Sequence, residues 1–115
     1  MRVDRLLKLA DYLETVPRHK FDMKFWSNRL KRVKRPKCGF SGCAIGHAME
    51  ARLFRGFRRY NYPVYEGYYG FNAVAKLFEI TTDQAKFDLF GSELRGTPHQ
   101  VAKRIRKFVE RAITP

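Results

Sequence analysis

Residues 97–112, TPHQVAKRIRKFVERA, decide the fold class of this 115-residue chain. Thr97 is a typical helix cap, Pro98 suits the first helical position, and Gln100 completes a capping box with Thr97. Apolar residues then recur at helical spacing at Val101, Ile105, Phe108, Val109 and Ala112. The segment therefore predicts a C-terminal amphipathic helix with one face in a core.

Similar patterns precede it. Apolar residues three and four apart predict a helix over 3–16, which Pro17 ends. Ser41 could cap a second helix running to about Phe54, and a short buried helix is expected over 71–78. Thr81 and Gln84 form a second capping box, and Gly91 is a C-terminal stop signal. Residues 60–70, rich in Tyr, Pro and Gly, predict a loop or a short strand pair.

These elements predict a mainly α protein: one domain over 1–115, a compact bundle of about five helices, and a Tyr-rich loop or small hairpin. The predicted core consists of Leu6, Leu7, Ala10, Leu13, Trp26, Ala44, Ile45, Ala48, Leu77, Phe78, Phe90, Val101, Ile105 and Phe108.

The composition and the hydropathy pattern bear on where in the cell the protein is expected. No apolar run approaches the roughly 18 residues of a membrane span, and the N-terminus lacks the apolar core of a signal peptide. Two cysteines are too few for a secreted disulfide scaffold. We therefore expect a cytoplasmic protein.

The formal charge of +13 is concentrated in one part of the chain. Residues 27–60 hold ten Lys and Arg against one acid, Glu50. Their cations are Arg29, Lys31, Arg32, Lys34, Arg35, Lys37, Arg52, Arg55, Arg58 and Arg59. Arg52, Arg55 and Arg59 are spaced three and four apart, so a helix continuing through them would present them on one face. Such a concentration favours a polyanionic partner, although charge runs are also ordinary solvated surface.

Five of the six tyrosines lie within ten residues, at positions 60, 62, 65, 68 and 69. Because Tyr60 and Tyr62 follow Arg58 and Arg59, they are candidates for stacking on bases or on a nucleotide. The alternative is a Tyr-rich strand pair folded over the core with its hydroxyl groups in water.

The segment 38–48, CGFSGCAIGHA, is the most distinctive motif. In its pattern Cys-Gly-x-x-x-Cys-x-x-Gly-His/Trp-Ala the chain resembles a loose group of small uncharacterised proteins of bacteria and their phages. The resemblance extends to the opening helix, to Phe21-Asp22-Met23 and to the closing helix at 97–105. It covers most of the chain and departs at residues 27–37, where this chain is unusually basic. It implies no established activity.

Three chemical interpretations of this motif compete. Cys43 and His47, four apart, could share a helix face and bind a metal with Cys38 or His99, but no fourth ligand is evident. Cys38, among basic neighbours, could be a nucleophile with His47 as base, but no orienting acid is near. The interpretation we favour is structural: small glycines allow close helix packing, and the thiols pack as small apolar groups.

The sequence predicts a basic, non-enzymatic protein without cofactor or metal that binds a polyanion, with nucleic acid as the leading class. Its site is predicted at the six cations of 29–37 together with Arg52, Arg55, Arg58, Arg59, Tyr60 and Tyr62. No base-reading helix is expected: residues 73–90 look like a helix-turn-helix, but Asp83 and Asp88 would repel phosphates, and Phe87 looks like core. The alternative function is an inhibitor or adaptor of a phage or mobile element that binds a host protein or sequesters a signalling nucleotide.

Overall fold

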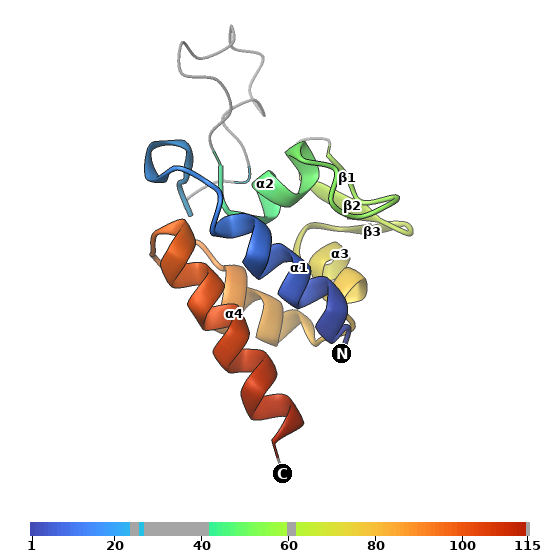
Figure 1. Cartoon of the computed structure of the whole chain (residues 1–115). Helices are drawn as coiled ribbons and strands as arrows, with labels where there is room; N and C mark the ends of the chain where they lie inside the picture. Colours follow the sequence, from blue (N-terminus) through green and yellow to red (C-terminus); the bar gives the residue numbers. More distant parts are fainter. Residues whose placement is uncertain (24–25, 27–41, 60–61, 115) are drawn as a thin grey trace, which may run out of the picture.

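The computed structural model describes residues 1–23, 26, 42–59 and 62–114 (Figure 1). This part is mainly helical, with a small sheet, as the sequence predicted. Its elements are α1 (Val3–Leu13), the 3₁₀ turn η1 (Arg18–Lys20), α2 (Ala44–Glu50), β1 (Arg58–Arg59), β2 (Pro63–Tyr65), β3 (Tyr68–Tyr69), α3 (Gly70–Phe78), the π-helix η2 (Gln84–Phe90) and α4 (Pro98–Ile113).

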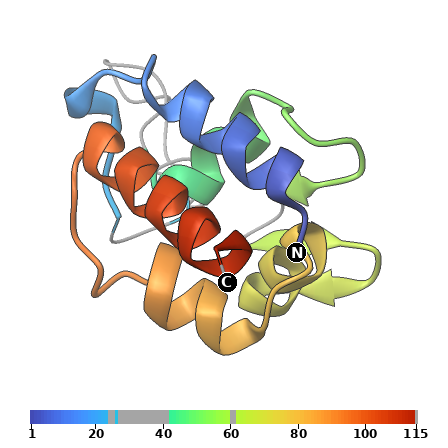
Figure 2. The same cartoon turned by 60° about the horizontal axis from the view of Figure 1, so that its bottom comes forward.

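Helices α1 and α4 lie side by side along the body (Figures 1 and 2). The predicted capping box starts α4: the Gln100 N–H donates to Thr97 Oγ1 at 3.2 Å, and the Thr97 N–H donates to Gln100 Oε1 at 2.9 Å. Both helices bury their apolar stripes against each other. The helix that the sequence indicated most clearly is therefore one half of the central packing interface.

Apolar side chains from α2, α3, η2, β2 and the α2–β1 connection contribute to the rest of the core. Phe78 is central to it, because its ring lies 5.6 Å from that of Phe54 and 5.7 Å from that of Phe90. The predicted core is confirmed except at three positions. Leu7 is 36% exposed, whereas Trp26 and Phe108 are only partly buried.

Helix η2 begins as predicted and then widens. The reciprocal bonds of the Thr81–Gln84 capping box are present, at 2.9 and 3.0 Å. From Gln84 the backbone adopts the wider π-helical form, and it leaves the helix at Gly91. A Cβ at Gly91 would collide with the Lys86 carbonyl oxygen, so this turn requires glycine.

Helix α2 differs from its prediction. Its N-cap is Cys43, whose Sγ accepts from the Gly46 N–H at 3.5 Å; the predicted cap, Ser41, lies outside the described residues. The helix ends at Glu50, not near Phe54. Arg52 has a positive φ of 54°, which takes the chain out of the helical path.

The tyrosine-rich region forms an antiparallel sheet of order β1-β2-β3 at the same end of the molecule as α2 (Figure 1). Glu66 and Gly67 connect β2 to β3 with φ angles of 48° and 83°, the signs that a type I′ hairpin turn requires. The small hairpin expected over 60–70 is thus confirmed. Among the described helices, none is long and apolar enough to cross a bilayer.

Candidate functional site

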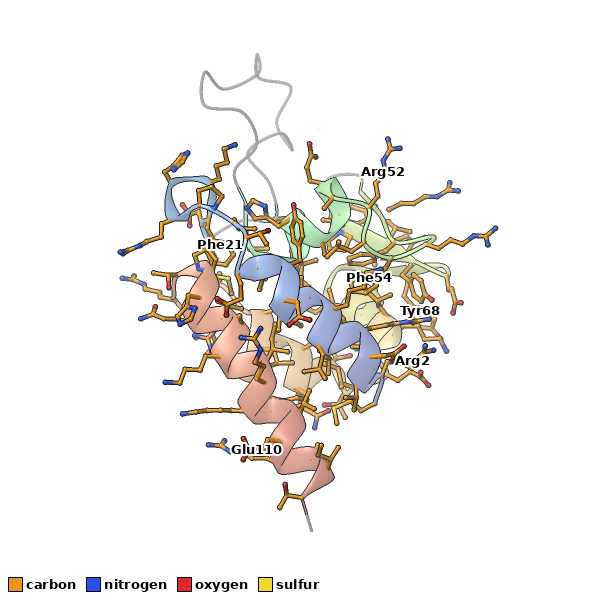
Figure 3. All side chains as sticks on the ribbon, in the orientation of Figure 1. Arg2, Phe21, Arg52, Phe54, Tyr68 and Glu110 are labelled. Carbon is orange, nitrogen blue, oxygen red and sulfur yellow. The ribbon has the colours of Figure 1, made fainter. Side chains whose placement is uncertain are left out.

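The predicted site residues divide into two groups. Arg29, Lys31, Arg32, Lys34, Arg35, Lys37 and Tyr60 lie outside the described residues. The others lie at the α2–sheet end: Arg52 and Arg55 in the turns after α2, Arg58 and Arg59 in β1, and Tyr62 just before β2. Figure 3 shows Arg52 projecting from this end.

Three of these arginines line one concavity, but not by the route that we expected. Because α2 ends at Glu50, Arg52, Arg55 and Arg59 do not share a helix face, so that interpretation was wrong. Instead, the turns after α2 bring Arg52, Arg55 and Arg58 around an open hollow of about 660 Å³. We call these three residues and their hollow the arginine concavity.

The floor of the arginine concavity is apolar and fixed. Phe54 and Phe57 line it, both are buried, and their ring centroids are 6.5 Å apart. Glu50, half-buried at the end of α2, is the only acid among the described residues that line it. Three exposed guanidinium groups around an apolar base are suited to a negatively charged ligand.

The arginines of the concavity make no ion pair within the described part of the chain. Arg106, on α4, by contrast has two acidic partners. Arg106 donates to Glu14 at 2.7 Å and to Asp11 at 3.0 Å. Cations gathered at an exposed surface create a positive field that attracts anions.

The tyrosines differ in burial. Tyr65 is buried and pairs with Arg5, whose Nη1 lies 3.4 Å from the hydroxyl group. Tyr62, Tyr68 and Tyr69 are 42%, 47% and 60% exposed. The rings of Tyr62 and Tyr69 contact each other edge to face at 5.6 Å, and the Lys76 ammonium lies 5.6 Å from the Tyr68 ring. The expectation that the tyrosines fold over the core holds for Tyr65 alone among these four.

The Cys/His motif is packed inside the body. Cys43 precedes the helix as its N-cap, and its carbonyl accepts from the His47 N–H at 2.9 Å. Burial raises the pKa of the Cys43 thiol to about 11, which keeps it protonated and a poor nucleophile at neutral pH. His47 is buried, stacks on Phe21 at 5.9 Å, and donates from Nε2 to the Lys20 carbonyl at 2.6 Å.

The proposed metal ligands do not assemble in the described structure. His99 binds Glu14 at 2.6 Å on the α1–α4 face, whereas His47 contacts η1. The part of the chain that the structure describes contains no cluster of three or more His, Cys, Asp or Glu side chains suited to a metal. Cys38, the predicted nucleophile, lies outside this part.

A second concavity, which the sequence did not indicate, lies between η2 and α4. This groove of about 570 Å³ is lined by Phe87 and Asp88 on one side and by Arg104, Lys107, Phe108 and Arg111 on the other. Phe87, which we expected in the core, is 59% exposed. The π-helical turn places Phe87 outside while Leu89 and Phe90 point inward.

Comparison of the chain with protein-family models, with curated proteins and with solved structures found no match.

Proposed function

We propose that this protein is a small, basic, cytoplasmic, non-enzymatic protein that binds nucleic acid. The observation that carries the proposal is the arginine concavity: three exposed guanidinium groups surround one hollow and are not paired with acids in the described structure. Guanidinium groups bind phosphate oxygens in pairs of hydrogen bonds, and each cation that neutralises a phosphate releases a condensed counterion.

The basic residues 29–37 belong to the same proposal through their charge. They contribute six cations that the chain places between η1 and α2, close in sequence to both. Their share in binding stays a sequence-based prediction. Changing all six to glutamine should weaken binding to any nucleic acid and should lower its salt dependence.

The test is a titration of fluorescently labelled nucleic acid with the whole protein at increasing KCl. The variant R52Q/R55Q/R58Q should bind more weakly, and the slope of log K against log salt should be shallower by about 2, since each lost phosphate contact removes about 0.7 for a single strand.

The matched control is K103Q/K107Q/R111Q, which removes the same charge from exposed positions on α4. It should retain more affinity than the first variant. Equal losses would show attraction to net charge without a site at the concavity. No detectable binding by the unchanged protein at low salt would contradict the proposed function.

A second candidate function is an adaptor that binds a protein, as the resemblance to phage proteins suggests, and the groove between η2 and α4 favours it. Phe87 and Phe108 offer apolar contact, and Arg104, Lys107 and Arg111 outnumber Asp88 at the groove. This charge fits an acidic segment with one or two apolar anchors. Binding of a second copy of this chain is disfavoured, because each chain carries a formal charge of +13 and the two would repel each other.

The adaptor function predicts a defined complex recovered from nuclease-treated host lysate. The same acidic protein should be captured at fixed stoichiometry by the unchanged chain and by R52Q/R55Q/R58Q, and lost with Phe87→Asp. Capture that survives Phe87→Asp would exclude the groove. Self-association in light scattering that Phe87→Asp abolishes would replace the acidic partner with a second copy.

A further inference from the structure

The register of the small sheet places an arginine and two tyrosines on one face. Arg58 pairs with Val64, and Val64 pairs with Tyr69, so these three residues form one row across β1, β2 and β3. Side chains directly opposite each other point to the same face, and Tyr62, two residues before Val64, points there too. We call Arg58, Tyr62, Val64 and Tyr69 the tyrosine face.

This face is turned toward solvent. Pro63 and Tyr65, which alternate with Val64 along β2, are buried, so the opposite face of the strand covers the core. Val64 is half-buried, whereas Arg58, Tyr62 and Tyr69 are exposed. The ring contact between Tyr62 and Tyr69 independently places both side chains on one side of the sheet.

The two rings are arranged to leave a flat surface open. Their planes meet at 87° with centroids 5.6 Å apart, an edge-to-face pair that holds both side chains in place. In such a pair the edge of one ring covers only one face of the other. Tyr69, the more exposed of the two, therefore offers ring surface for another planar group at little cost in side-chain entropy.

Arg58 belongs both to the tyrosine face and to the arginine concavity. A planar group stacked on the tyrosines therefore lies beside cations that can take the phosphates on either side of it. Bases with free flat faces next to phosphates are the chemistry of a single strand, because in a duplex the bases stack on each other.

We propose that the tyrosine face is a base-stacking platform, and that the nucleic acid bound by this protein is single-stranded. The inference rests on the proposed function and adds the strand state of the ligand and the residues that detect it. Stacking on Tyr69 and Tyr62 tolerates any base, so the site selects single strands without selecting a sequence.

The experiment compares three probes on the whole protein: labelled oligothymidylate, a DNA hairpin duplex, and inorganic polyphosphate as a competitor that has charge but no bases. The double variant Y62L/Y69L should lose roughly 5- to 100-fold in affinity for oligothymidylate. The salt slope of the variant, its duplex affinity and the inhibition constant of polyphosphate should stay unchanged, because the arginines remain.

Two controls separate stacking from damage to the sheet. Tyr68→Leu removes an exposed tyrosine that pairs with Tyr65 in the neighbouring register position and so points to the other face; it should bind oligothymidylate as the unchanged protein does. Tyr69→Phe keeps the ring and should also retain affinity. Retained affinity in both variants would show that the aromatic rings on the tyrosine face cause the effect, and not the loss of a tyrosine in general.

The outcomes distinguish this inference from the function on which it rests. If R52Q/R55Q/R58Q weakens binding while Y62L/Y69L does not, or if Tyr68→Leu costs as much as Y62L/Y69L, the stacking platform is wrong and the nucleic-acid function stands. Equal affinity for hairpin and oligothymidylate would also overturn it. If the unchanged protein binds neither nucleic acid, both proposals fail together.

Discussion

The long α1–α4 face and the α2–sheet end both carry arginines, and they use them in opposite ways. Along α1 and α4, Arg106 is held between Asp11 and Glu14, and Arg104 donates to three backbone carbonyl groups. At the other end, within the described residues, the arginine concavity has no acidic partners.

The difference teaches that a cation's pairing is more informative than its presence. A guanidinium group that already binds carboxylates or carbonyl groups contributes to the fold and has few donors left. One that is exposed among other cations adds repulsion to the folded state and keeps its donors available to an anion. The contrast predicts that the two sets of arginines respond differently to mutation and to pH.

The largest effect on stability is expected at Arg104. Its guanidinium group donates to Leu89 O at 3.3 Å, Leu94 O at 3.4 Å and Arg95 O at 2.8 Å, which joins α4 to the segment after η2. Arg104→Met leaves these acceptors without their donor, so the free energy of unfolding should fall by about 1–3 kcal/mol. Urea denaturation measures it, with Arg104→Lys expected between the two. An unchanged midpoint would mean that Arg104 is not a structural arginine.

Acid should weaken the α2 end before the α1–α4 face. Burial lowers the pKa of His47 from its usual 6.5, so the neutral ring contributes stability that is present above pH 6.5 and lost as pH falls through the lower folded-state pKa. His47→Gln keeps a donor for the Lys20 carbonyl but cannot titrate. Thermal unfolding between pH 7 and pH 5 should therefore show a shallower decline for His47→Gln. Equal slopes would contradict the assignment.

The α1–α4 face should respond only at lower pH. Hydrogen bonds from His99 and Arg106 lower the pKa of Glu14 from its usual 4.5. The carboxylate therefore contributes stability above pH 4.5, and this is lost as pH falls through the lower folded-state value. Glu14→Gln should flatten the stability profile below pH 4.5 and leave the window around pH 6 unchanged. If Glu14→Gln changed the stability only around pH 6, the expected order, in which the α2 end responds to acid before the α1–α4 face, would be wrong.

The smallest effect on stability is expected at the arginine concavity itself. R52Q/R55Q/R58Q removes three exposed side chains that make no ion pairs in the described structure. The free energy of unfolding should therefore change by less than about 0.5 kcal/mol at each position, and any change should be an increase, because repulsion between the cations is relieved. Urea denaturation at low salt measures it. A clear loss of stability would show that these arginines are structural, like Arg104.

Local signals in the sequence predicted most of the fold correctly. Both capping boxes, Thr97–Gln100 and Thr81–Gln84, formed because each is closed by residues three apart and depends on nothing else. The prediction for α1 was wrong at Leu7. Because leucines stand at 6, 7 and 9, the sequence alone is compatible with more than one buried face of this helix. Packing against α4 selected Leu6 and Leu9 and left Leu7 exposed.

The functional features depend on contacts that local patterns do not contain. Glu14 and Arg106 are 92 positions apart, so the sequence could not reveal which arginines are paired. Arg52, Arg55 and Arg58 were candidates by their charge, and turns rather than the expected helix bring them together. Tyr69 was noted as one of a cluster, but its place beside Tyr62 follows only from the strand register. The widening of η2, which exposes Phe87, has no recognised sequence signal.

The contact between Phe21 and Gly42 has a consequence for how this chain can be redesigned. The two residues form a parallel bridge, the Asp22 N–H donates to the Gly42 carbonyl at 2.9 Å, and Lys20 O accepts from Gly42 as well as from His47. The body therefore holds two points of the chain that are 21 positions apart in the sequence side by side. Loop closure depends only weakly on length. A short Gly/Ser linker in place of residues 27–41 should leave the body folded, and other peptides could be grafted at the same point.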